Sequence, residues 1–292
     1  MDTIFVNLPR IAYEAKKNDE KFLSILRENI NLSLEGFKAK KKFINERLKQ
    51  PLLPVLSGGG GAVPYFYERN ASYNLSFIGL TEAVEAHSDS GEQIHGAGDF
   101  ATKLLQETSK FLKEFSREEE MRITISQRPG DEAVERLAEL DIEQYGRSVM
   151  AHDAARGASY YTDIPTIPLT TEMPINARIG AESKIQPLLP GGHLNVICIS
   201  DDAQPKALFR LTEGALTSGC KFLTYSSNYT TCSACGHTDK GIWPKCSKCA
   251  SDRLSYLGRA STSLLPFSLW PDAKRRSVDR RVAYRLMDSG RA

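Results

Sequence analysis

Four cysteines near the C-terminus constrain this chain more than any other feature. They form two CxxC pairs separated by ten residues, Cys232 with Cys235 and Cys246 with Cys249. Each CxxC turn presents two sulfurs to the same point, so four thiolates can converge tetrahedrally on one metal at about 2.3 Å. The spacing predicts a four-cysteine zinc ribbon. A closed thiolate shell leaves no open coordination position, so we expect this zinc to be structural.

The composition is that of a globular protein in a reducing compartment. Of 292 residues, 41% are hydrophobic and 25% are charged, which excludes a disordered chain. The net charge of +2 gives no general electrostatic argument for nucleic acid or an anionic membrane as a partner. Cys198 and Cys220 lie in apolar surroundings, and we interpret them as buried thiols of a cytoplasmic protein. No apolar run reaches the roughly 20 residues of a membrane span, and nothing indicates export.

The rest of the chain alternates between helical and extended patterns, which is typical of the α/β class. Residues 160–168 are too rich in proline for a helix, and 187–193 are predicted to form a turn. We expect strands at 4–6, 73–79, 122–126, 194–199 and 222–225. We expect helices that begin at residues 11 and 80, helices over 99–120, 131–145 and 205–217, and one long helix or a pair of helices over 18–49.

Two stretches could in principle bind phosphate. Four consecutive glycines at 58–61 could cradle one, but no Lys-Ser/Thr follows as a P-loop requires, so we interpret them as a mobile loop. The lysine-rich run at 38–42 is interpreted as the solvated face of a helix rather than a phosphate-binding patch.

Five blocks follow one another along the chain in a recognisable order. They are VNLPRIAY at 6–13, NLSFIGLTE at 74–82, YTDIPTIP at 161–168, GGH at 191–193, and the cysteine cluster with its tail at 270–280. Together they resemble the anaerobic, class III ribonucleotide reductases, glycyl-radical enzymes that reduce ribonucleotides to deoxyribonucleotides.

The resemblance implies a fold and a division of the chain. The family fold is a ten-stranded α/β barrel with a central finger loop, and this chain resembles its C-terminal portion. We therefore expect a partial reductase barrel over residues 1–226, the zinc ribbon over 227–257, and a radical-loop equivalent with a C-terminal tail over 258–292.

The family mechanism depends on residues that this sequence does not reproduce. In the family a cysteine thiyl abstracts a ribose hydrogen, and a glycyl radical on a loop beside the ribbon generates that thiyl. The loop here has Thr262 where the glycine belongs, and the nearest glycine, Gly258, would need a shifted register. The finger-loop cysteine and its partner cysteine would both lie upstream of Asn7, and neither Cys198 nor Cys220 falls in a matching context.

Two interpretations follow from these departures. The chain is either the C-terminal subunit or fragment of a split reductase, whose N-terminal reductase chain carries the finger-loop cysteine, or a catalytically inactive paralogue. In the split form, the threonine raises the hypothesis that adenosylcobalamin generates the thiyl radical, as in class II reductases.

The resemblance also assigns expected roles to individual residues. Asn7 is the candidate to contact the ribose or assist proton movement, with capping of the Pro9 turn as the alternative. The block that binds substrate phosphates in the family corresponds to Tyr161, Thr162, Asp163 and Thr166, although a carboxylate at 163 would repel phosphate and a turn is the alternative. Arg259 would brace the radical-loop equivalent, with an ordinary surface arginine as the alternative.

The C-terminal tail carries a basic run at 274–281. Zinc ribbons with basic flanks occur in nucleic-acid-binding proteins, so this is a third possible function. The family resemblance instead implies a basic helix on the ordinary protein surface, so a nucleotide is the expected substrate and nucleic acid is not an expected partner.

Overall fold

The structure is a computed structural model that describes residues 2–50, 52–58, 63–88, 99–146, 149 and 159–287. The regular elements follow in the order β1 (Asp2–Asn7), α1 (Leu8–Ala15), α2 (Asp19–Leu48), α3 (Pro54–Ser57), β2 (Ser72–Ile78), α4 (Leu80–His87), α5 (Asp99–Glu118), β3 (Arg122–Ser126), α6 (Glu132–Tyr145), α7 (Ile175–Ile185), β4 (Asn195–Cys198), α8 (Pro205–Thr217), β5 (Leu223–Ser226), β6 (Tyr229–Cys232), β7 (Thr238–Lys240), β8 (Leu254–Arg259), β9 (Leu264–Pro266) and α9 (Asp272–Arg276), with short 3-10 turns at 68–70, 186–188, 267–269 and 278–280.

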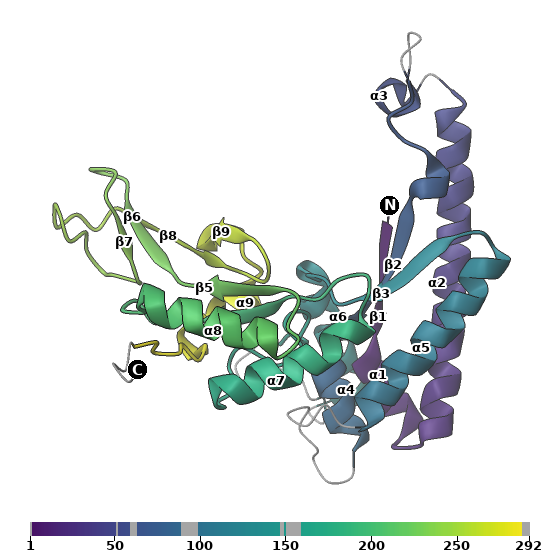
Figure 1. The fold of residues 1–292 in the computed structure, drawn as a ribbon, viewed down its shortest axis with the longest axis horizontal. Helices are drawn as coiled ribbons and strands as arrows, with labels where there is room; N and C mark the ends of the chain where they lie inside the picture. The colour runs from purple at the N-terminus through teal and green to yellow at the C-terminus, as the bar shows by residue number, and fades with distance from the viewer. Residues whose placement is uncertain are drawn as a thin grey trace.

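The first sheet consists of three parallel strands in the order β1-β2-β3. Because side chains alternate across a strand, one face carries Leu75, Phe77 and Ile125, which pack into the main core with α2 and α5. Figure 1 shows these two helices lying along the sheet. The opposite face is polar, since Asn74 bonds to Thr124 at 2.8 Å. This polar face leads to the candidate site.

The second sheet pairs β4 with β5 in parallel and is joined to the first by a backbone bridge. Gly191 N–H donates to Ile125 O at 2.7 Å, and Gln127 N–H donates to Gly192 O at 2.9 Å. A Cβ at position 191 would lie 2.7 Å from Ile125 O, so only glycine allows this approach. The GGH block therefore closes the gap between β3 and β4.

The third sheet contains the cysteine cluster and is antiparallel, in the order β7-β6-β8-β9. It lies at the opposite end of the molecule from α2 (Figure 1). Strand β8 continues through Arg259 and forms a hairpin with β9, whose tip is residues 260–263. The cysteine cluster and the β8–β9 hairpin thus share one sheet.

Most predicted elements are confirmed, with specific differences. The pattern at 18–49 is one continuous helix, α2. Helix α7 was not predicted, because its apolar residues lack a clear helical period and it begins directly after Pro174. Of the predicted glycine loop, residues 59–61 lie outside the described part of the chain. None of the helices within the described ranges is long and apolar enough to cross a membrane.

Candidate metal centre and candidate active site

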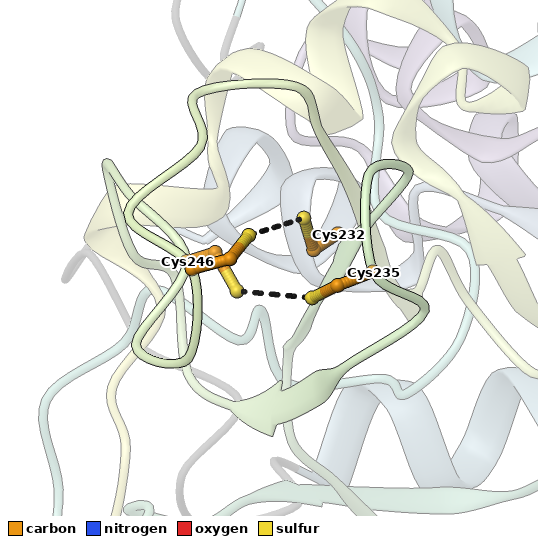
Figure 2. A group of neighbouring side chains, drawn as sticks. Cys232, Cys235 and Cys246 are labelled. Atoms are coloured by element: carbon orange, nitrogen blue, oxygen red, sulfur yellow. Dashed lines mark hydrogen bonds between the residues drawn. The ribbon is translucent and has the colours of Figure 1, made fainter.

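The four cysteines that the sequence predicts as metal ligands come together at one point. Their sulfur atoms all lie within 4.8 Å of one another, and Figure 2 shows three labelled side chains directed toward a common centre. Cys232 Sγ is 3.6 Å from Cys249 Sγ, and Cys235 Sγ is 3.7 Å from Cys246 Sγ. Tetrahedral zinc with bonds of about 2.3 Å separates its sulfur ligands by about 3.8 Å. These two separations match those expected for zinc bound by four thiolates.

The two cysteine turns are built alike. Gly236 N–H donates to Cys232 O and Ala250 N–H donates to Cys246 O, both at 2.9 Å. Cys232 is the last residue of β6 and pairs with Leu254 of β8. A metal held here would fix the base of the β8–β9 hairpin.

The hairpin tip places Thr262 rather than a glycine beside a cavity. Gly258 lies within β8, where a Cβ would come 2.7 Å from Phe267 Cε1, so its missing side chain serves packing. Arg259 Nη1 donates to Thr262 O and braces the turn. Thr262 is half-buried. It lines a cavity of about 240 Å³ with Gln127, Arg128, Pro129, Ile164, Gly192, His193, Leu194 and Phe222.

Two buried polar contacts shape the wall of this cavity. His193 Nε2 lies 2.6 Å from Glu182 Oε2, and both side chains are fully buried. The other oxygen of Glu182 accepts the Ile167 N–H at 2.7 Å. Thr166 Oγ1 donates to Gln127 Oε1 at 2.5 Å, which ties the 160–168 segment to the carboxyl end of β3.

Asn7 belongs to a separate buried network centred on Asp141 of α6. Its Nδ2 donates to Asp141 Oδ2 at 2.8 Å, while its Oδ1 accepts the Arg10 N–H and caps α1. Arg10 Nη2 forms an ion pair with Asp141 Oδ1 at 2.6 Å. Tyr161 Oη donates to Asp141 Oδ2 at 2.8 Å. Burial, with Tyr13 and Asp141 nearby, raises the pKa of Tyr161, so the phenol stays protonated.

The other predicted phosphate-binding residues are engaged by the protein itself. Thr162 N–H donates to Glu82 Oε1 at 2.6 Å, and Thr162 O accepts the Gly79 N–H at 2.7 Å. Asp163 is buried and pairs with Lys274 at 2.5 Å, which removes the expected repulsion between a bare carboxylate and phosphate. The structure gathers Tyr161, Thr162, Asp163 and Thr166 in one segment, whereas Asn7 is linked to the first of them through their shared partner Asp141.

The tail is not the ordinary basic surface that the sequence indicated. Lys274 points inward to Asp163, and Arg281 donates to the carbonyls of Arg259 and Ala260 at 2.7 and 3.1 Å. Arg281 also lies over the Trp270 ring, 4.7 Å from its centroid. Two of the five cations in the run at 274–281 therefore bind internal carbonyls and a carboxylate, which weakens the nucleic-acid interpretation.

Sequence reasoning missed the buried partners Asp141, Glu182 and Lys274. Asp141 and Glu182 lie within helices, where an acidic residue is normally solvated, so no local signal marks them. Lys274 was read as one charge of a basic run.

Comparisons with known proteins give a consistent picture. A family model described as anaerobic ribonucleoside-triphosphate reductase matches residues 1–284. The anaerobic ribonucleoside-triphosphate reductases of Escherichia coli K12 and Salmonella typhimurium LT2 are each 25% identical over 318 residues, which cover 97% of this chain and 42% of the relative. The chain therefore spans about two fifths of the length of these relatives.

Solved structures show the same fold. One structure, described as anaerobic ribonucleotide reductase, has a TM-score of 0.82 at 21% identity. The match covers 98% of this chain and 45% of the chain in that structure. The Thermotoga maritima anaerobic ribonucleotide reductase with MES in the active site has a TM-score of 0.77 at 22% identity, covering 91% of this chain and 43% of that chain. The α/β fold described above thus matches part of that structure.

Proposed function

The chain belongs to the anaerobic ribonucleoside-triphosphate reductase family, and from this premise we propose that it is the C-terminal part of a ribonucleotide reductase. The proposed reaction converts a ribonucleotide to a deoxyribonucleotide by a thiyl-radical mechanism. Strands β1 to β5 would form the C-terminal half of the family's barrel, and the zinc ribbon would hold the hairpin that reaches into it.

The observation that carries the proposal is the position of the hairpin tip. Thr262 faces the same cavity as Gln127, which follows β3, and His193, which precedes β4. Ligands of parallel sheets characteristically bind beyond the carboxyl ends of the strands, which is where Gln127 lies. The cavity is thus a suitable place for part of a nucleotide.

Zinc bound to the four cysteines would have a structural role, because four thiolates complete its tetrahedral shell. The chain's own residues would then shape the substrate site. Gln127 holds Thr166, and Glu182 holds both His193 and the backbone at Ile167. In this proposal Tyr161, Thr162, Asp163 and Thr166 set the path of the segment beside the nucleotide, and Asn7, which bonds to Asp141 and caps α1, holds the end of β1 in place.

The catalytic cysteines would come from a companion N-terminal reductase chain. The two cysteines outside the cluster are poor substitutes, since burial raises the pKa of both Cys198 and Cys220. Neither thiol is among the residues that line the cavity beside Thr262.

The proposal has two branches, which differ in whether the chain takes part in the reaction and in what generates the radical. Thr262 in the place of the family's glycine motivates adenosylcobalamin as the source of the thiyl radical. The same residue favours the second candidate function, an inactive paralogue with a structural or regulatory role.

Anaerobic reconstitution tests these branches. The chain is combined with a companion chain carrying the finger-loop cysteine, and the conversion of ribonucleoside di- and triphosphates is followed with formate or a dithiol, with and without adenosylcobalamin. We expect deoxyribonucleotide only from the combined chains. Stable association with nucleotide binding but no turnover under any condition would overturn the reductase proposal in favour of the paralogue.

A further inference from the structure

Three buried polar side chains from distant parts of the chain meet at the hairpin tip. Asp163 belongs to the 160–168 segment, Ser261 to the tip, and Lys274 to α9. Their exposed fractions are 4%, 3% and 3%. Buried charges are rare in proteins unless they are paired, so their meeting here is a specific feature of the fold.

The contacts among them form a closed set. Lys274 Nζ lies 2.5 Å from Asp163 Oδ2 and also donates to Ser261 Oγ. Ser261 Oγ lies 3.3 Å from the same carboxylate oxygen, and Gly130 N–H donates to it at 2.8 Å. The second oxygen accepts the Ile164 N–H at 2.8 Å. The carboxylate is therefore fully occupied by donors of this chain.

A serine beside a buried lysine could also suggest a nucleophile with its base. The contacts do not fit that role, because Lys274 Nζ is paired with Asp163 and donates to Ser261 Oγ rather than accepting from it. The group is suited to holding position rather than to catalysis.

The metal centre alone does not hold the tip. The pairing of β6 with β8 covers Leu254 to Leu257 and stops before Arg259, so residues 260–263 lie beyond it. The tip instead takes its outside contacts from the tail and the 160–168 segment, through Arg281 on the carbonyls of 259 and 260 and through Ser261.

We propose that Asp163 and Lys274 are positioning residues that, with Ser261, form a tip latch holding Thr262 against the cavity. The pair would act through the hairpin, without touching the substrate. The functional importance of the position of Thr262 rests on the proposed function. The structural role of the tip latch does not depend on that function.

The test measures access to position 262 in the full chain. Thr262→Cys is introduced, and the rate of modification by a maleimide is followed by peptide mass spectrometry, which separates this thiol from the native cysteines. Lys274→Met in this background should raise the rate at least tenfold. The matched control is Arg276→Met, an exposed cation of the same helix, which should leave the rate unchanged.

A second variant separates positioning from stability. Adding Asp163→Asn to Lys274→Met removes the unpaired buried charge, so the melting temperature should recover toward that of the Thr262→Cys chain. The labelling rate should nevertheless stay high, because the ammonium that joined the segment to the tip is still missing.

Two outcomes would overturn the proposed latch. In the first, Lys274→Met leaves the labelling rate at position 262 unchanged. In the second, the double variant recovers both the melting temperature and the labelling rate of the Thr262→Cys chain. Both are measured without nucleotide or turnover. A failed reductase assay therefore leaves this result intact, and a failed latch leaves the reductase proposal intact.

Discussion

Replacing Asp141 by asparagine is expected to destabilise the protein strongly, because three donors converge on one buried carboxylate. Asp141 is fully buried and accepts from Asn7 Nδ2, Arg10 and Tyr161 Oη. Hydrogen bonds to a charged group contribute about 1.5–3 kcal/mol each. Asparagine keeps one acceptor oxygen but turns an amide donor toward the remaining partners.

The expected cost is smaller than the sum of the three contacts. The Arg10 side chain is 33% exposed, so water can rehydrate its guanidinium when the carboxylate is lost. Removing one partner of a buried pair typically costs about 3–5 kcal/mol, and this exposure lowers the expectation to about 3 kcal/mol.

Urea denaturation measures this change. Asp141→Asn should lower the midpoint without altering the slope with denaturant, as for a change in stability alone. The control is Glu139→Gln, an exposed residue of the same helix, which should change the free energy of unfolding by less than about 0.5 kcal/mol. A loss below about 1 kcal/mol for Asp141→Asn would refute the central role of this carboxylate.

Three further changes test the metal centre, the cavity wall and the first sheet. Cys246→Ser should reduce bound zinc from about one per chain to a small fraction, as measured by elemental analysis, and full retention of zinc would contradict a four-cysteine site. Glu182→Gln should cost about 2–3 kcal/mol in thermal or urea unfolding, because His193 and a backbone N–H lose a charged acceptor, and a neutral result would show that the buried pair is dispensable. Burial and the neighbouring Glu68 raise the pKa of Tyr73 to about 12. This folded-state value lies above the ordinary value of 10.0, so stability should be complete below pH 10 and fall as the pH rises toward 12, and Tyr73→Phe should remove that part of the fall.

The metal centre was predictable because its signal is local. Two CxxC turns with a short spacer define the ligand set without reference to the rest of the chain, and the sulfur distances fit the same metal. The parallel strands were likewise visible as short segments rich in apolar and β-branched residues.

The contacts of the candidate site were hidden because they join residues far apart in sequence. Asp141 lies 134 residues from Asn7, and Lys274 lies 111 residues from Asp163. A single charged residue in a helical pattern is normally on the surface, so its burial becomes visible only when its partner is placed beside it. The run at 274–281 illustrates this, because two of its cations serve the interior.

The Gly-Gly-His block at 191–193 was predictable only in part. Its turn was predicted, whereas its function in joining β3 to β4 depends on the close approach of Gly191 to Ile125 O, which no spacing in the sequence reveals. The resemblance to a reductase identified the block without explaining it.

The central claim is that the hairpin tip faces a ribonucleotide at the cavity shared by Thr262, Gln127 and His193. The most direct measurement is the protection of Thr262→Cys from maleimide by ribonucleoside triphosphates in the reconstituted pair of chains, with Ser255→Cys on the exposed face of β8 as control. We predict that saturating nucleotide slows labelling at 262 by at least tenfold and leaves labelling at 255 unchanged. Equal labelling of position 262 with and without bound nucleotide would contradict the account.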